Sequence, residues 1–181
     1  MENEVSELDK AIYQKIRLNV CDFIRQQAQK WDSESIKLLD IAPQNHAGAR
    51  QFFLKSKVIT ADIERNSGAD YIMDICKNNR KKVVSESFDI IVCTEVLEHT
   101  LNPFSAVREI HRLLKPNGLL LMSTPYDFRI HGPLPDCWRF TEHGIRALLQ
   151  NFLIIDITPL ENENRFLMPF HYTTIAKKVV K

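Results

Sequence analysis

Three ionisable side chains, those of His131, Asp136 and Arg139, lie within nine residues of one another. Residues 126–141 read YDFRIHGPLPDCWRFT and contain His131, Asp136 and Arg139. This is more charge than turn formation requires. An imidazole titrates near neutral pH and can accept a proton from a hydroxyl group. We therefore expect His131 to be the catalytic base, with Asp136 and His99 as the other candidates, while Trp138 and Phe140 are interpreted as a lid on the core.

Two acidic residues lie at or near the ends of short apolar runs further upstream. Asp40 lies within the run 36–41, and Asp62 follows the run 57–61, 22 positions after Asp40. An acidic residue at this spacing can reach the hydroxyl groups of a ribose. Alternatively, Asp62 caps a helix that begins at Ile63.

The apolar runs that carry these residues predict a β-sheet. Strands that alternate with helical or irregular segments are typical of a parallel sheet. The last two runs are joined by a polar segment without a crossover helix, which predicts an antiparallel pair. The seven runs are 36–41, 57–61, 71–73, 88–93, 119–123, 152–157 and 172–176.

The N-terminal residues 1–30 predict an amphipathic helix that packs on the edge of the domain. Its apolar stripe consists of Leu8, Ile12, Ile16, Val20, Phe23 and Ile24. The chain has 181 residues, of which 44% are hydrophobic, enough for one well-filled core. We find no repeat or long linker, and predict a single domain over 1–181 with this helix packed on it.

Charge and apolar content exclude several classes of function. The 24 basic and 23 acidic residues leave a formal net charge of +1, so no general field favours nucleic acid or an anionic membrane. No apolar stretch approaches the roughly 20 residues that span a bilayer, and the acidic N-terminal segment MENEVSELDK has no apolar region like that of a signal peptide. We expect a cytoplasmic protein without membrane insertion; the oligomeric state is not indicated.

A complete strand–helix–strand unit lies between residues 88 and 126. The almost continuously apolar run 88–93 predicts a strand buried on both faces. Asn102 and Pro103 predict the start of a helix, and Lys115 to Gly118 its end. We expect the inward side of this helix to consist of Phe104, Val107, Ile110 and Leu114. Ligands of such sheets bind beyond the carboxyl ends of the strands.

The segment FDIIVCTEVLEHTLNPFSAVREIHRLLKPNGLLLMSTP resembles motifs IV to VI of the type 11-like class I methyltransferases. The resemblance implies an α/β, Rossmann-like fold: a seven-stranded, mostly parallel sheet with an antiparallel last strand and helices on both faces. It also implies S-adenosyl-L-methionine as the cofactor. The matching positions assign the methionine end to Asp40, Ala42, Thr94 and Glu95, the ribose to Asp62 with Ile63, and the adenine to Asp74 with Ile75.

The turn after the first strand departs from the family pattern. The family has glycines here, whereas this chain has Ala42, Pro43 and Gln44. Proline removes a hydrogen-bond donor, and neither alanine nor proline readily adopts positive φ. Adenosylmethionine has no pyrophosphate to cradle, so binding remains compatible with this turn. The absence of G-x-G-x-x-G argues against an NAD enzyme.

The loop after the fourth strand contains Glu95, Glu98 and His99 at i, i+3 and i+4 spacing. On one helical turn these side chains would share a face. Some relatives with E-x-x-E-H bind a divalent ion at this place. We favour a role of Glu98 and His99 in stabilising the loop by hydrogen bonds, and predict no metal.

Taken together, the sequence predicts a methyltransferase that acts on a hydroxyl group of a small molecule or of a sugar or glycan. The segment P-x-D-x-W-R-F-T is similar to one in small methyltransferases of glycan pathways. A non-catalytic binding or regulatory subunit with the same fold is the alternative, because the turn at Ala42 is poor in glycine. An RNA or protein methyltransferase is less favoured, since a nearly neutral chain offers no obvious docking surface.

Overall fold

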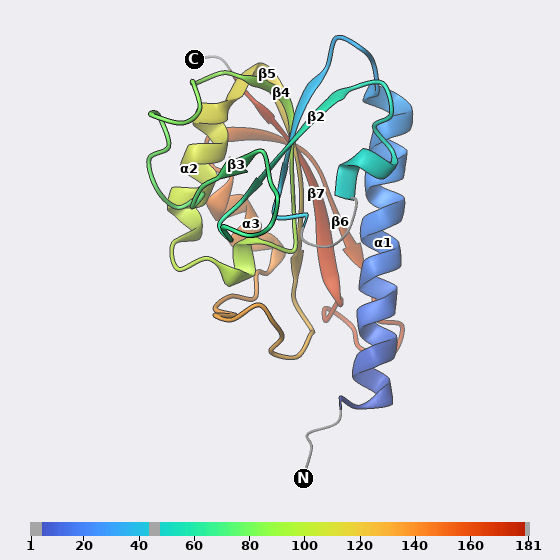
Figure 1. Ribbon diagram of the computed structural model, residues 1–181. Coiled ribbons are helices and arrows are strands. Elements are labelled where there is room, and N and C mark those ends of the chain that lie inside the picture. The colour runs from blue at the N-terminus through green and yellow to red at the C-terminus, as the bar shows by residue number, and fades with distance from the viewer. Residues whose placement is uncertain (1–4, 44–47, 180–181) are drawn as a thin grey trace.

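The computed structural model describes residues 5–43 and 48–179 (Figure 1). Its centre is a seven-stranded sheet of order β3-β2-β1-β4-β5-β7-β6. All neighbouring pairs are parallel except those of β7, which runs antiparallel to β5 and β6. The predicted mostly parallel sheet with a reversed last strand is confirmed. The strands are β1 (Lys37–Ile41), β2 (Lys57–Asp62), β3 (Tyr71–Ile72), β4 (Phe88–Thr94), β5 (Leu114–Pro125), β6 (Phe152–Leu160) and β7 (His171–Lys178).

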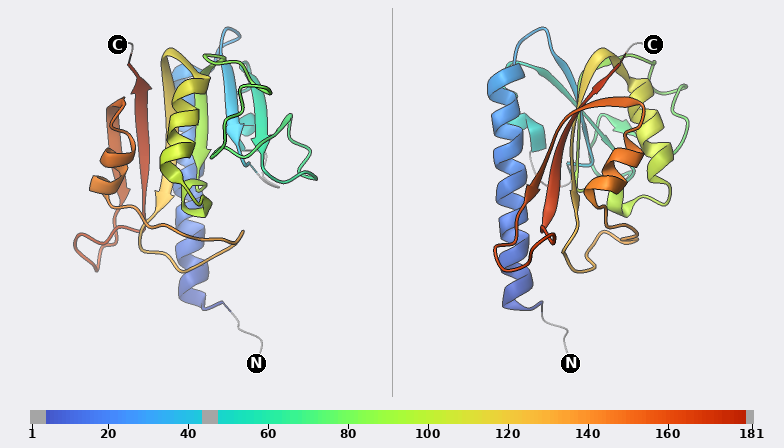
Figure 2. Two further views of the ribbon diagram at one scale, coloured as in Figure 1. Left: turned by 90° about the vertical axis from the view of Figure 1, so that its left-hand side faces the viewer. Right: turned by 180° about the vertical axis from the view of Figure 1, so that it is seen from behind.

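Helices cover both faces of this sheet, as predicted. Helix α1 (Glu7–Trp31) lies along one face, and α2 (Pro103–Leu113) and α3 (Glu142–Leu148) lie on the other (Figures 1 and 2). Two short 3₁₀ turns complete the description, η1 (Gly48–Gln51) and η2 (Leu97–His99). Alternate strand residues point to opposite faces. Leu38 and Ile90 therefore join the core under α1, whereas Leu39 and Ile91 join the core under α2.

Helix α1 packs differently from the prediction. Its buried residues share a core with Leu38 of β1, Ile90 of β4 and Leu121 of β5, which are central strands. The helix therefore crosses a face of the sheet and does not lie at its edge. Leu8 was also assigned to the buried stripe, but it is 70% exposed because the first turns of α1 extend past the sheet. Among the described residues, no helix has the length and apolar character needed to cross a membrane.

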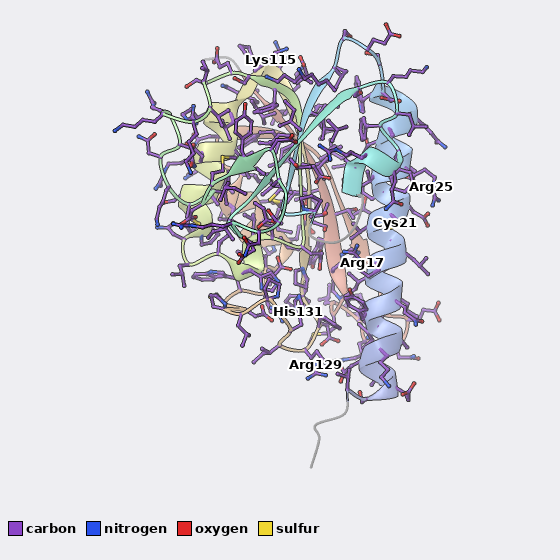
Figure 3. The ribbon with its side chains drawn as sticks, viewed as in Figure 1. Arg17, Cys21, Arg25, Lys115, Arg129 and His131 are labelled. Carbon is purple, nitrogen blue, oxygen red and sulfur yellow. The ribbon has the colours of Figure 1, made fainter. Side chains whose placement is uncertain are left out.

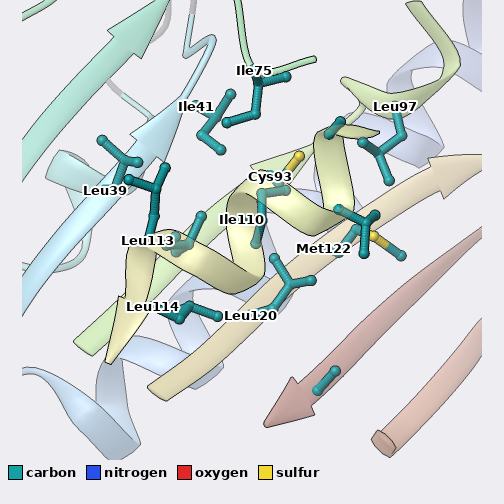
Figure 4. Packing of buried hydrophobic residues seen from close by; sticks show 14 of the residues in the cluster. Leu39, Ile41, Ile75, Cys93, Leu97, Ile110, Leu113, Leu114, Leu120 and Met122 are labelled. Carbon is teal, nitrogen blue, oxygen red and sulfur yellow. The ribbon is translucent and has the colours of Figure 1, made fainter. Parts of the chain in front are cut away.

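Helix α2 begins where the sequence predicts. The Asn102 side chain accepts a hydrogen bond from the Ser105 backbone N–H, and Pro103 occupies the first turn. One residue of the predicted stripe is wrong: Phe104 is 47% exposed, and the buried side of the helix consists of Pro103, Ala106, Val107, Ile110 and Leu113. Leu114 is buried, but it is the first residue of β5. Figure 4 shows this side of α2 packed against Leu39, Cys93, Leu120 and Met122 of the sheet.

Candidate active site

A cleft opens beyond the carboxyl ends of β1 and β4, between these strands and α1. Its lining includes Asp40, Ala42, Thr94 and Glu95 from the strand ends. His99 and His131 line it from η2 and from the loop after β5. Figure 3 shows His131 at the end of the molecule opposite Lys115, beside α1. This is the edge at which ligands of such sheets bind.

Helix α1 supplies a wall of the cleft that the sequence did not reveal. Tyr13 and Arg17 line it from α1. The Tyr13 ring stacks on Phe128 with 6.3 Å between ring centroids, and Phe128 meets His131 edge to face at 5.0 Å. Amphipathic periodicity predicts that a helix packs, but not which polar residues along its border face a cleft.

In the turn after β1, Ala42 adopts a backbone conformation that usually favours glycine. Ala42 has a left-handed φ of 51°, and its N–H donates to the Ala61 carbonyl at 2.7 Å. Asp40 is buried, and its Oδ2 accepts a hydrogen bond from the Ala49 N–H at 2.7 Å. Burial raises the pKa of Asp40 to about 6, although the Ala49 N–H and the Arg50 charge oppose the shift. Gln44 lies outside the described residues.

Gly48 packs directly against Asp40 and Pro43, where a larger residue has no room. Its φ is +55°, and a Cβ built on it would lie 2.2 Å from Asp40 Oδ2 and 2.8 Å from Pro43 Cβ. Only glycine allows η1 to approach Asp40 this closely. Gly48 was not predicted from the sequence, because the family pattern places its glycines directly after the strand.

Asp62 ends β2 and is buried, but no helix follows it, so the alternative of a helix cap is wrong. Its Oδ1 accepts a hydrogen bond from the Glu64 N–H at 2.8 Å, which closes a tight turn, and Ile63 is exposed. No described contact occupies Asp62 Oδ2. One carboxylate oxygen thus remains to accept from a ligand hydroxyl.

Asp74 follows β3 and is half-buried. Its Oδ1 accepts from the Cys76 N–H at 2.8 Å, and Lys77 Nζ lies 3.5 Å from Oδ2. Ile75 is buried in the core beneath α2.

By contrast, both the N–H and the hydroxyl of Thr60 donate to Asp70 Oδ2, so Asp70 serves the packing of β2. Asp62, Ile63, Asp74 and Ile75 are not among the described residues that line the cleft.

Glu95 is turned away from the predicted acidic cluster. It has a φ of 53°, and its Oε1 accepts a hydrogen bond from the Ser123 hydroxyl at 2.7 Å. His171 Nδ1 lies 3.4 Å from the same oxygen, and His171 Nε2 lies 2.8 Å from Asn19 Oδ1 on α1. This network ties α1 to the loop after β4. His171 was not predicted from the sequence; it reaches the site because β7 pairs with β5.

Glu98 and His99 gather with His131 instead. Glu98 is fully buried, and neither carboxylate oxygen has a hydrogen-bond partner among the described residues. Its Oε1 lies 3.7 Å from His99 Nε2 and 3.8 Å from His131 Nε2. The prediction that the Glu98 side chain stabilises its loop by hydrogen bonds is therefore wrong. Burial and the nearby Glu95 charge raise the pKa of Glu98 well above its usual value.

His131 is oriented by Asp136, as a catalytic base requires. Asp136 Oδ2 lies 3.1 Å from His131 Nδ1 and accepts the His131 backbone N–H at 2.9 Å. Partial burial alone would raise the pKa of Asp136. The hydrogen bonds and charge of Arg139, together with the His131 contacts, outweigh it and lower the pKa to about 2. Desolvation lowers the pKa of His99, whose Nδ1 lies 3.1 Å from the Pro135 carbonyl.

The rest of this loop is fixed to η2. The N–H groups of Cys137 and Trp138 donate to the Glu98 carbonyl at 2.7 and 3.2 Å. Trp138 Nε1 donates to the Thr100 carbonyl at 2.7 Å. Phe140 is buried as predicted, whereas Trp138 is partly exposed. His131 is therefore held beside Glu98 by contacts on both sides of the loop.

Comparison with known families identifies the class of protein. A family described as "methyltransferase domain" matches residues 13–153, well over half of the chain. The chain belongs to this family. The predicted methyltransferase class, with S-adenosyl-L-methionine as its cofactor, is confirmed at the level of the family.

Curated relatives match this methyltransferase over short segments. A ubiquinone biosynthesis O-methyltransferase of Glaesserella parasuis is 55% identical over 40 residues, which are 22% of this chain and 17% of the relative. One of the same name from Actinobacillus pleuropneumoniae is 35% identical over 66 residues, 36% of this chain and 26% of the relative. The matches thus span about a quarter or less of the relatives' length.

Solved structures share the fold. A SAM-dependent methyltransferase of Methanosarcina mazei has a TM-score of 0.64 at 16% identity, covering 84% of this chain and 97% of that one. An N1-methyltransferase of Burkholderia thailandensis, solved with 1,6-didemethyltoxoflavin and S-adenosylhomocysteine, has a TM-score of 0.60 at 14% identity, with 99% and 94% covered. The [4+2]-cyclase SpnF reaches 0.68 at 15% identity, with 92% and 81% covered.

Proposed function

We propose that this methyltransferase transfers the methyl group of S-adenosylmethionine to a hydroxyl group of a small molecule or a sugar. The observation that carries the proposal is the shared cleft, which is lined by Asp40, Ala42, Thr94 and Glu95 from the strand ends and also by His99 and His131. The two matched relatives bear the name O-methyltransferase, which supports oxygen as the acceptor atom.

The cofactor would lie along the carboxyl ends of β1 to β4. Its methionine end would meet Asp40, Ala42, Thr94 and Glu95, whereas its ribose would meet Asp62 beside Ile63. Two observations fit this assignment: Asp62 Oδ2 has no contact among the described residues, and Ala42 adopts the left-handed φ that the family's glycines would allow. Asp74 and Ile75 would contact the adenine at the far end. When bound, the cofactor supplies a methyl group on a positively charged sulfur.

His131 is the proposed proton acceptor. The bound cofactor would supply its methyl group to the acceptor oxygen and would keep the electron pair of the broken carbon–sulfur bond. The hydroxyl proton moves to His131 Nε2, which points toward Glu98 and His99, while Nδ1 is held by Asp136. His99 is the second imidazole within reach of the same point, since the two rings lie 4.8 Å apart. Holding the acceptor oxygen in line with the methyl group within the cleft would supply much of the remaining rate acceleration.

Calorimetry with S-adenosylhomocysteine tests the cofactor site. We expect saturable binding to the wild type, and a loss of about tenfold for Asp62→Ala, which corresponds to one hydrogen bond to a charged group. Asp156→Ala, which removes an exposed acid on β6, serves as the matched control and should bind normally. Absence of binding by the folded wild type would refute the proposal.

The acceptor class needs a separate measurement. Methyl-labelled cofactor is incubated with free sugars, nucleotide sugars and phenols, and the labelled product is analysed by mass spectrometry. The expected product carries the label on oxygen. Label found only on nitrogen, carbon, RNA or protein would overturn the hydroxyl assignment.

A further inference from the structure

Glu98 is a buried carboxylate without a hydrogen-bond partner among the described residues. Leaving such a group unpaired costs free energy, more so when it is charged. Two imidazole nitrogens lie within 3.8 Å of one of its oxygens, and the three potential ligand atoms lie within 4.8 Å of one another. We propose that Glu98, His99 and His131 bind a divalent transition-metal ion at the acceptor end of the cleft.

The orientation of both imidazoles supports this site. His99 Nδ1 lies 3.1 Å from the Pro135 carbonyl, and His131 Nδ1 lies 3.1 Å from Asp136 Oδ2. An acceptor at Nδ1 fixes the tautomer that carries its proton there and leaves a lone pair on Nε2. Histidine ligands of metal ions are usually held in this way. Both Nε2 atoms then face the same carboxylate.

The spacing of the three groups is close to that of a loaded site. Ligand atoms about 2.1 Å from a common ion are roughly 3.0 to 3.4 Å apart in octahedral or tetrahedral geometry. The distances of 3.7 and 3.8 Å from Glu98 therefore require an inward movement of less than about 1 Å, and the bound of 4.8 Å on all three separations requires at most about 2 Å. The backbone is already fixed, because Cys137 and Trp138 donate to the Glu98 carbonyl.

The ligand types select the class of metal. Magnesium and calcium prefer oxygen ligands, whereas two imidazoles and one carboxylate suit manganese, iron, cobalt, nickel or zinc. A site of Glu95, Glu98 and His99 was considered from the sequence and was not favoured. In the structure Glu95 is instead engaged by Ser123 and His171. His131, which lies 32 positions after His99, takes its place.

The metal site deepens the proposed function and rests on it for the nature of the acceptor. A hydroxyl that coordinates a dication loses its proton at lower pH, and the proton then passes to a base in the solvent. In the metal-loaded enzyme His131 and His99 would act as ligands, and the proton would not go to His131 Nε2. Direct transfer to His131 would remain the route in the metal-free enzyme.

Titration of chelator-treated, untagged protein with Mn²⁺ and Co²⁺ tests the site without any turnover. We expect one ion per chain by calorimetry and a Co²⁺ visible spectrum typical of nitrogen and oxygen ligands. Glu98→Gln should weaken binding by at least about 100-fold, and Asp136→Asn, which loosens His131, by about 10- to 100-fold. His143→Ala removes an exposed imidazole on α3 and should bind like the wild type.

Several outcomes would overturn the proposal. These are no saturable binding by the folded wild type, unchanged binding by Glu98→Gln, or an equal loss with His143→Ala. His99→Asn provides a second ligand variant should Glu98→Gln fail to fold. If the wild type binds S-adenosylhomocysteine but no metal ion, the metal site alone is refuted. If it binds a metal ion but not S-adenosylhomocysteine, the proposed function alone is refuted.

Discussion

Replacing Gly48 with alanine should damage both the stability of the protein and its cofactor site. The new Cβ would lie 2.2 Å from Asp40 Oδ2 and 2.8 Å from Pro43 Cβ, far inside contact distance. Backbone with φ of +55° costs alanine about 1 to 2 kcal/mol more than glycine. Moving η1 away would also break the hydrogen bond from Ala49 to the Asp40 carboxylate, which contributes about 1.5 to 3 kcal/mol. The expected loss of unfolding free energy is therefore about 3 to 5 kcal/mol.

Gly68→Ala is the matched control for this substitution. Gly68 also has a left-handed φ, of +73°, but a Cβ there meets nothing within 4 Å. It should therefore lose only the backbone contribution of about 1 to 2 kcal/mol. Urea unfolding measures both variants, and calorimetry with S-adenosylhomocysteine should show weaker binding for Gly48→Ala only. Equal losses of stability in the two variants would refute the assigned role of the contact with Asp40.

Three further predictions concern the acceptor side of the cleft and α1. His131→Ala should reduce methyl transfer by about 10²- to 10⁴-fold and leave S-adenosylhomocysteine binding nearly intact; unchanged turnover would remove His131 from the mechanism. Because the pKa of Asp136 falls from 3.8 to about 2 on folding, its stabilisation should be present above pH 4 and be lost as the pH falls through 2. Acid-unfolding curves of Asp136→Asn should lack this component, and a curve like that of the wild type would contradict it. Asn19→Ala should cost about 1 to 3 kcal/mol in urea unfolding by leaving Nε2 of the buried His171 unpaired, and a neutral effect would exclude this link between α1 and Glu95.

The sequence predicted the parts of the fold that depend on neighbouring residues. Asn102 and Pro103 start α2 because a side-chain cap and a fixed φ act within one turn. Continuous apolar runs predicted the central strands for a similarly local reason. The errors at Leu8 and Phe104 arose where periodicity continues beyond the surface that a helix covers. Where a helix leaves the sheet depends on the whole fold.

The site was less predictable because its contacts join distant segments. The spacing of Glu95, Glu98 and His99 suggested one cluster, but the positive φ of Glu95 turns its carboxylate toward Ser123 on β5. His131 joins the other two because a later loop is held on the Glu98 carbonyl. Neither feature leaves a periodic signal. The negatively charged Asp136 was recognised in sequence, but its pairing with Arg139 became visible only in the structure.

The pairing of Arg139 with Asp136 limits what the acceptor can be. Arg139 donates to both carboxylate oxygens of Asp136 and to the carbonyls of Phe128 and Arg129. Its donors are thereby directed at its own loop, and a planar guanidinium with several fixed partners has little capacity to bind a substrate anion. Asp136 and Arg139 thus serve to orient His131. A neutral hydroxyl acceptor therefore fits the loop better than an acceptor recognised through a negative charge at Arg139.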